Sequence, residues 1–187
     1  LRFILDDNLK LNNTIKTQIA VEILCGMIFL LKSEVSHDNI TVDNILLNDS
    51  FESKIMLFSI FDRQQKEDNF NDKIENFDFQ YSSNSYVHSF GVILHELFIG
   101  HQYDEKENLI ELEPSESVSS FCIDLIKKCL SSDLSIIPGL EIMLQEIREN
   151  FFKLADEVDY DTVNKRYNEI AKFEESHQPK SVKLLMS

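Results

Sequence analysis

Glycine is scarce in this chain of 187 residues, which contains only four. They stand at positions 26, 91, 100 and 139, so no two of them are close together. Glycine-rich phosphate loops, such as G-x-G-x-x-G and the Walker loop, need closely spaced glycines because their backbone N–H groups must approach the phosphates. Neither pattern can be written from this sequence. That excludes phosphate binding by a glycine-rich loop of this chain.

Positive charge is also scarce, with 18 Lys and Arg against 33 Asp and Glu and a formal net charge of −15. Because nucleic acids and anionic membranes are bound mainly through Lys and Arg, we expect neither as a partner. The three cysteines, Cys25, Cys122 and Cys129, lie in apolar helical patterns without C-x-x-C spacing. They predict buried free thiols rather than a zinc site, and such thiols favour a reducing, cytoplasmic location.

Long apolar runs are missing as well. The best run, residues 23–31, is interrupted by Cys25-Gly26 and is shorter than the roughly 18–20 residues that a membrane span needs. We therefore predict no membrane-spanning segment. The chain begins at Leu1 without a signal-like pattern, which favours a fragment of a longer protein. Its 43% hydrophobic residues and 14 Phe are enough for one domain with a substantial core.

What the chain does contain is helical periodicity, with apolar residues three and four positions apart. The pattern predicts helices over residues 15–31, 86–99, 118–130, 137–147 and 158–173. Asn12-Asn13-Thr14 signals the start of the first, Ser85 caps the second, Gly100 ends the second, and Pro138 stands near the first turn of the fourth. Residues 62–85 are polar without a period and predict a long loop. Residues 176–187 are interpreted as a tail.

The most informative stretch is residues 35–59. A polar loop, HDNITVDN at 37–44, holds one His, two Asn and two Asp, a composition suited to a functional site. Two short apolar runs follow, at 45–47 and 54–58, separated by Asn48-Asp49-Ser50. Turn residues between two such runs predict a small β-hairpin. The expected fold class is therefore mainly α with one β-hairpin.

The loop and hairpin resemble the catalytic loop and metal-binding segment of protein kinases, H-R-D-L-x-x-x-N followed by D-F-G. His37 and Asn44 match that pattern. Residues 18–30 resemble the helix before the catalytic loop. Residues 81–97, YSSNSYVHSFGVILHEL, resemble the central helix of the C-terminal lobe, and residues 121–133, FCIDLIKKCLSSD, resemble its F-x-x-L-I-x-x-C-L-x-x-D segment. The resemblance implies a kinase-like C-lobe over residues 1–150, an extension over 151–187, and no N-lobe, because its glycine-rich loop and lysine strand are missing.

Several positions depart from the family pattern. Asn39 stands where the catalytic Asp belongs, and loss of a positioned general base typically costs about 10²–10⁴-fold in rate. Thr41 replaces the Lys that steadies the transferred phosphate, and Asp38 replaces the Arg of H-R-D. Leu57 stands at the metal-binding Asp and offers no oxygen to Mg²⁺. Asn44 is retained, either as a metal position or as a cap of the loop–strand junction.

Two structural partners of the family also differ. Tyr86 occupies the Asp position of the central helix, which normally hydrogen-bonds the backbone of the catalytic loop, so this structural partner is changed. Ile136-Ile137 replaces the Lys-Arg before Pro138 and removes the partner of the A-P-E glutamate, for which residues 73–75 are the nearest candidate. Phe58 of D-F-G is kept, consistent with a packing role.

Other constellations are weaker. Ser59, Ser89 or Ser119 could pair with a His as a hydrolase dyad, but none lies in G-x-S-x-G. The histidines at 88, 95 and 101 are too widely spaced to favour a metal face over helix surface or core. The acidic connector at 104–116 is interpreted as a solvated loop, with a docking surface for a basic partner as the alternative.

The sequence thus favours a catalytically inactive, pseudokinase-like protein that acts by binding another protein, whose identity the sequence does not give. We expect no cofactor and no metal of its own; ATP and Mg²⁺ belong to it only if the family activity survives. The alternative is a truncated member of an active serine/threonine or tyrosine kinase family with ATP-dependent phosphoryl transfer. A non-functional gene product is a third reading.

Overall fold

The computed structural model describes residues 1–7, 11–35, 37, 40–56, 79–106, 108–115, 118–133, 135–149 and 154–176, with backbone alone at 79–81. Its elements follow the order α1 (Arg2–Asp6), α2 (Asn13–Lys32), η1 (Val42–Asn44), β1 (Ile45–Leu47), β2 (Ser53–Ile55), α5 (Phe79–Phe98), η2 (Leu109–Glu111), α6 (Ser120–Cys129), α7 (Leu140–Glu149) and α9 (Tyr160–Ser176). The predicted fold class, mainly α with one small hairpin, is confirmed.

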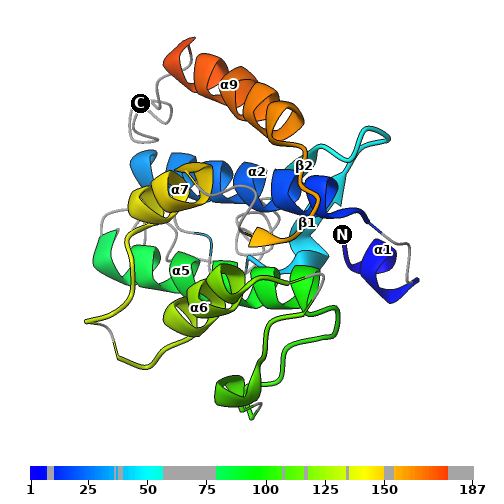
Figure 1. The fold of residues 1–187 in the computed structure, drawn as a ribbon. Coiled ribbons are helices and arrows are strands. Elements are labelled where there is room, and N and C mark those ends of the chain that lie inside the picture. Colours follow the sequence, from blue (N-terminus) through cyan, green and yellow to red (C-terminus); the bar gives the residue numbers. More distant parts are fainter. Residues whose placement is uncertain are drawn as a thin grey trace.

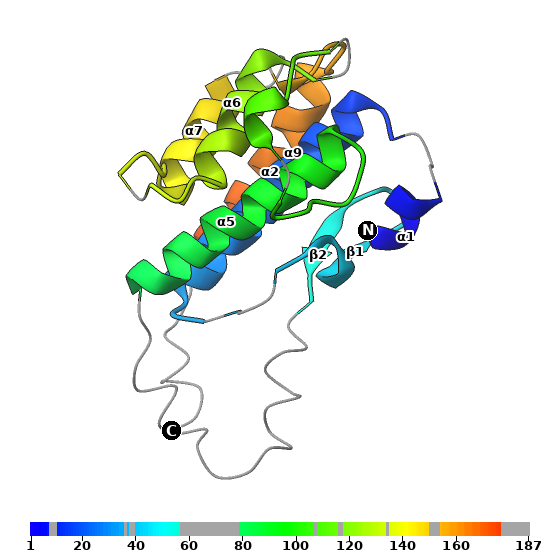
Figure 2. The same ribbon diagram turned by 90° about the horizontal axis from the view of Figure 1, so that it is seen from below.

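Helix α2 is the hub of the molecule. It contacts α5, α7, α9 and β2, while α6 packs on α5. In Figure 1 these helices lie in layers, with α9 outermost, α2 and α7 next, and α5 and α6 beyond them. Figure 2 shows α2 and α5 side by side, with the hairpin and α1 beside one end of the pair. The hydrophobic core therefore lies around α2 and α5 and extends to α6 and α7.

The sequence of α2 explains this central place. The side chain of Asn12 caps the helix by accepting a hydrogen bond from the Ile15 N–H at 2.8 Å, as the sequence predicts. Apolar residues surround most of the helix, and Ile19, Leu24 and Met27 are fully buried. A helix that is apolar on most faces must be covered on most faces.

The same composition bears on the prediction that the chain has no membrane-spanning segment. By length and composition α2 could cross a membrane, because the 20-residue helix tolerates the few polar residues that interrupt its apolar runs. In this structure, 67% of the relevant window is buried inside the protein. The core helix of a soluble protein passes the same test, so α2 is weak support for a membrane span.

Helix α5 begins at Phe79, earlier than predicted, so the interpretation of residues 79–85 as loop and of Ser85 as a cap is wrong. The polar residues in this segment made it look like a loop in the sequence. Ser82 is only 3% exposed, so packing against the rest of the protein overrides its weak helical preference. Residues 62–78, the rest of the predicted loop, lie outside the described residues. Gly100 ends the helix region with φ of 91°, as predicted.

The contact between α5 and α6 depends on a glycine. A Cβ atom at Gly91 would lie 2.7 Å from the Cβ of Cys129 and 2.9 Å from the Cδ2 of Leu130, so only glycine permits this approach. Cys122 and Cys129 on α6 and Cys25 on α2 are buried free thiols, as predicted. Burial raises the pKa of each of the three to about 12, which keeps them protonated and unreactive.

The hairpin pairs β1 and β2 antiparallel, with Ile45 opposite Ile55 and Leu47 opposite Ser53. Its turn is held by Asn48, whose side-chain oxygen accepts hydrogen bonds from the N–H groups of Ser50 (3.0 Å) and Glu52 (2.9 Å). The second strand was predicted at 54–58, but the pairing covers Ser53–Ile55. Residues 57 and 58 lie outside the described residues.

The last three helices follow the predicted pattern with shifted ends. Ser119 caps α6, its Oγ accepting from the Cys122 N–H at 3.1 Å, and Pro138 stands just before the first turn of α7, as predicted. Helix α9 confirms the predicted added helix, with Val163 fully buried. Residues 177–187, interpreted as a tail, lie outside the described residues.

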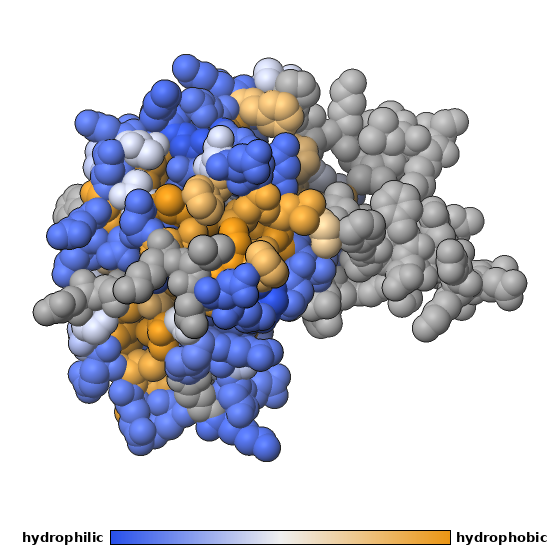
Figure 3. Space-filling model, turned by 90° about the vertical axis from the view of Figure 1, so that its right-hand side faces the viewer, coloured by the Kyte–Doolittle hydropathy of each residue, from blue (hydrophilic) through white to orange (hydrophobic). Residues whose placement is uncertain are grey.

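Apolar side chains also reach the surface. Figure 3 views the molecule from the side of α1 and the hairpin in Figure 1 and shows apolar side chains gathered among hydrophilic ones. The large apolar residues exposed among those described include Phe3 (72%) and Leu46 (53%) on the first helix and first strand, and Phe173 (58%) on α9. Exposed apolar surface of this kind is where a binding partner gains most.

Candidate functional site

The candidate site is the loop at residues 37–44, which leads from α2 into the hairpin. The structure describes His37 and residues 40–44 of it. Asp38 and Asn39 lie outside the described residues, as do Leu57, Phe58 and Ser59 beyond the second strand. Asn39 and Leu57, the two positions on which the predicted loss of activity rests, are therefore known from the sequence alone.

Tyr86 of α5 anchors the start of the loop. Its hydroxyl donates a hydrogen bond to the carbonyl oxygen of Val35 at 2.6 Å and accepts one from the His37 backbone N–H at 3.0 Å. Tyr86 is 1% exposed, and burial raises its pKa to about 12, so the hydroxyl stays protonated and able to donate. Although Tyr replaces the Asp of the family pattern at this position, its longer side chain reaches the loop backbone itself.

Both ends of the loop are also tied to Met56, the residue that follows the second strand. The His37 ring, 2% exposed, lies with Nε2 2.7 Å from the carbonyl oxygen of Met56, so that nitrogen donates. The Met56 N–H in turn donates to the carbonyl oxygen of Asn44 at 2.8 Å. Ile40 and Val42 are buried between these contacts. The backbone of the loop is thus fixed at both ends.

Asn44 and Thr41 lie at the 3-10 turn that ends the loop. The Asn44 N–H donates to the Thr41 carbonyl oxygen at 3.0 Å, and the Thr41 hydroxyl lies 3.4 Å from Asp43 Oδ2. Asp43 is the acidic residue that the structure describes in this loop, and its carboxylate faces Arg2 at 3.2 Å. Hydrogen bonding to Arg2 lowers the pKa of Asp43, so it is ionised and engaged by a cation rather than poised as a base.

The weaker candidates include the histidines at 88, 95 and 101 and Ser119, and their surroundings in the structure are structural. His88 is exposed, whereas His95 is fully buried and packs edge-on against His101 (4.9 Å) and Tyr103 (5.3 Å). Helix surface and core, as predicted, account for His88 and His95, whereas His101 is exposed just beyond the end of α5. Within the described ranges no group of three or more His, Cys, Asp and Glu could hold a metal ion. Ser119 serves as the cap of α6.

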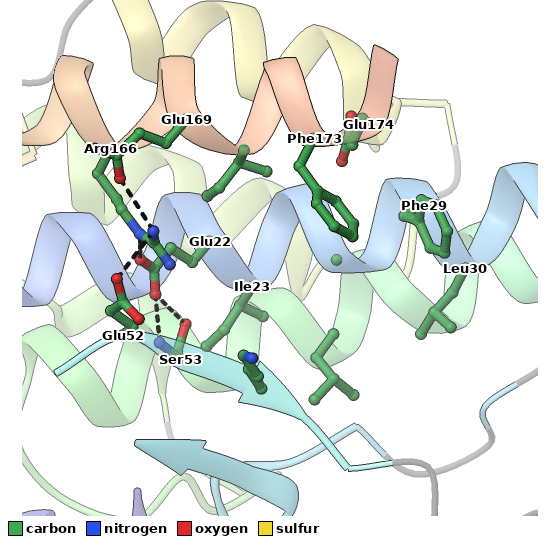
Figure 4. A pocket seen from close by; sticks show the side chains of 14 residues that line it. Glu22, Ile23, Phe29, Leu30, Glu52, Ser53, Arg166, Glu169, Phe173 and Glu174 are labelled. Atoms are coloured by element: carbon green, nitrogen blue, oxygen red, sulfur yellow. Dashed lines mark hydrogen bonds and ion pairs between the residues drawn. The ribbon is translucent and has the colours of Figure 1, made fainter. Parts of the chain in front are cut away.

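One polar cluster is missed by sequence reasoning. Glu22, whose side chain is 2% exposed, accepts hydrogen bonds from Arg166 Nε (2.5 Å), from the Ser53 hydroxyl (2.8 Å) and from the Ser53 N–H. Arg166 also pairs with Glu52 (3.0 Å) and Glu169 (3.2 Å). Figure 4 shows this cluster joining α2, the hairpin and α9. The available signal was Glu22 itself, a charge inside an otherwise apolar helix, which must find a partner when buried.

Comparison with known proteins agrees with the resemblance in the sequence. Residues 1–145 match the family described as protein tyrosine and serine/threonine kinase. A search of curated proteins finds no match to this chain. Helix α9, with the Arg166 that it contributes, lies beyond the matched residues. The match covers most of the chain, including the loop, the hairpin and the central helix α5, and so the chain belongs to the protein tyrosine and serine/threonine kinase family.

Proposed function

We propose that this kinase-family chain is catalytically inactive and acts by binding another protein. The observation that carries the proposal is the pair Asn39 and Leu57, at the catalytic Asp and the metal-binding Asp of the family pattern. An amide cannot take the proton of a substrate hydroxyl, and a hydrocarbon side chain cannot ligate Mg²⁺. Either substitution alone removes a part that phosphoryl transfer requires.

The preserved scaffold supports a binding role. The contacts of Tyr86 with Val35 and His37, and of His37 with Met56, hold the loop although its chemical groups have changed. A chain that keeps its core packing and loses its reactive groups retains a defined surface. Such a surface is what a protein-binding module needs.

The residues present do not suit the family's metal. Asn44 offers one neutral oxygen, and the carboxylate of Asp43 is engaged by Arg2. Mg²⁺ prefers carboxylates in near-octahedral geometry, so we propose that the chain takes neither Mg²⁺ nor ATP as a cofactor. The net charge of −15 favours a protein partner over nucleic acid or membrane, and the buried free thiols favour a cytoplasmic setting.

The alternative is a truncated member of an active kinase family. The intact anchoring of the loop and the retained Asn44 favour it, because both would be needed for ATP-dependent phosphoryl transfer. It requires another group to replace the base at position 39 and the metal ligand at position 57.

A phosphoryl-transfer assay decides between the two. The chain, alone and fused to a kinase N-lobe, is incubated with Mg²⁺, labelled ATP and a generic protein substrate, and we expect no transfer above background. The double variant Asn39→Asp, Leu57→Asp in the same fusion serves as the reference with both carboxylates restored. Transfer by the unmodified fusion that disappears in Asn39→Ala would overturn the proposal, and so would a Mg²⁺-dependent thermal shift with ATP for the chain alone.

A further inference from the structure

A groove of about 590 Å³ lies between α2, the second strand and α9. Its apolar lining comes from all three elements and includes Ile23, Phe29, Ile55, Ile170 and Phe173. Figure 4 looks into the groove and shows Phe173 of α9 above Ile23 and Leu30 of α2. A volume of several hundred Å³ with a mainly apolar lining is typical of binding sites.

The groove has a fixed polar end. The cluster of Glu22, Ser53 and Arg166 closes it where α9 crosses the hairpin, and Arg166 is engaged there by three carboxylates. Helix α9 lies outside the residues that match the kinase family, so this wall of the groove comes from beyond the matched region. The cluster holds α9 at a set distance from α2, so the groove is built by the fold.

The opposite end carries an acidic group. Glu174 stands beside Phe173 on the last turns of α9 and lines the groove. Burial raises the pKa of Glu174, while Lys32 lowers it through a longer-range attraction. The described residues give its carboxylate no hydrogen bond and no ion pair within 4.0 Å. A half-buried carboxylate in that position gains from a cation brought by a ligand.

The lining as a whole is negative, because Glu22, Glu52, Glu169 and Glu174 face only Lys54 and Arg166. We propose that the groove binds a short peptide segment of a partner protein that places apolar side chains in the groove and a Lys or Arg against Glu174. The proposal deepens the protein-binding part of the proposed function and rests on it. Apolar contacts supply the affinity, and charge complementarity selects basic over acidic segments.

A peptide-binding assay tests the proposal on the full chain. The probe is a fluorescein-labelled synthetic peptide with three leucines alternating with serines, preceded by two lysines. We expect saturable binding by fluorescence anisotropy that weakens as salt increases. Replacing the lysines of the probe by glutamates, or its leucines by serines, should each weaken binding by about tenfold or more. Equal binding of all three probes, or none, would overturn the proposal.

Surface variants locate the site. Phe173→Ser should weaken binding about tenfold, and Glu174→Gln about threefold to tenfold with a smaller salt dependence. Tyr160→Ser and Glu175→Gln change an exposed aromatic residue and an exposed carboxylate of the same helix away from the groove, and should leave binding within about twofold. All four substituted side chains are exposed or half-buried, so folding should survive. Equal losses in the control variants would overturn the assignment.

A competing occupant is the chain's own residues 177–187, which contain Lys180, Lys183 and the run Leu184-Leu185-Met186. If the full chain does not bind the probe, but the full chain with Leu184→Ser and Leu185→Ser does, the groove belongs to that segment and the partner-peptide proposal is wrong. The readout is independent of catalysis. Failure to bind would leave the inactivity of the chain standing, and phosphoryl transfer would contradict the inactivity while leaving the groove unaffected.

Discussion

The contact between Tyr86 and the loop makes the sharpest test of the structure. In Tyr86→Phe the ring stays in the core and only the hydroxyl is removed. The change leaves the Val35 carbonyl and the His37 N–H without the partner that each has at 2.6 Å and 3.0 Å. The two backbone groups lie 51 and 49 positions from Tyr86 in the sequence, so the loss separates α5 from the loop and touches no local structure.

The loss in the free energy of unfolding depends on how deeply the two backbone groups are buried. A buried backbone group that loses its partner costs about 1–3 kcal/mol. His37 is 2% exposed and should cost about 2 kcal/mol, whereas half-buried Val35 can be reached by water and should cost about 1 kcal/mol. The expected loss is therefore about 3 kcal/mol out of a typical 5–15 kcal/mol, and a fall in Tm of about 6–12 °C.

Urea unfolding followed by circular dichroism measures this loss, and hydrogen exchange at the His37 amide reports the broken contact directly. Tyr167→Phe is the matched control: its ring packs over Arg148 at 3.9 Å, and the described residues give its hydroxyl no hydrogen bond. The control should change the free energy of unfolding by less than about 0.5 kcal/mol. A Tyr86→Phe variant as stable as this control, with an unchanged His37 exchange rate, would refute the role assigned to the hydroxyl.

Three further predictions concern the core. Arg166→Leu should destabilise the protein by about 2–4 kcal/mol in urea unfolding because buried Glu22 loses its cation. Adding Glu22→Gln to this variant should recover most of the loss, and equal stability of the single and double variants would contradict the role of Arg166. Gly91→Ala should cost about 1–2 kcal/mol, since a Cβ there lies 2.7 Å from the Cys129 Cβ, whereas at Gly139 the nearest atom is 4.0 Å away and Gly139→Ala should be neutral. The three buried thiols have pKa values raised from 9.0 to about 12, so above pH 9 the unfolded chain binds fewer protons than the folded one. The free energy of unfolding should then fall between pH 9 and about pH 12, and the thiols should resist alkylation at pH 8 until urea is added; rapid alkylation of the folded chain would argue against their burial.

Local patterns were enough for most of the helices and for the hairpin. The cap at Asn12 and the stop at Gly100 depend on neighbouring residues only, and both are where the sequence predicts them. The start of α5 was misplaced because Ser82 and its neighbours look like a loop until the core that buries Ser82 is known. Composition does not separate a core helix from a membrane-spanning one in α2 for a related reason: a helix surrounded by protein and a helix surrounded by lipid have the same composition.

The sequence by itself indicated the family and showed which side chains stand at positions 39 and 57. Ordered motifs and the identity of the residue at positions 39 and 57 can be read directly, because a side chain either has a carboxylate or lacks one. Only the tertiary structure decided that Tyr86 anchors the loop. It also decided that Arg166 of α9 pairs with Glu22, 144 positions away in the sequence, and lines a groove. Such contacts join residues far apart in the chain, and no local period or spacing encodes which of them meet.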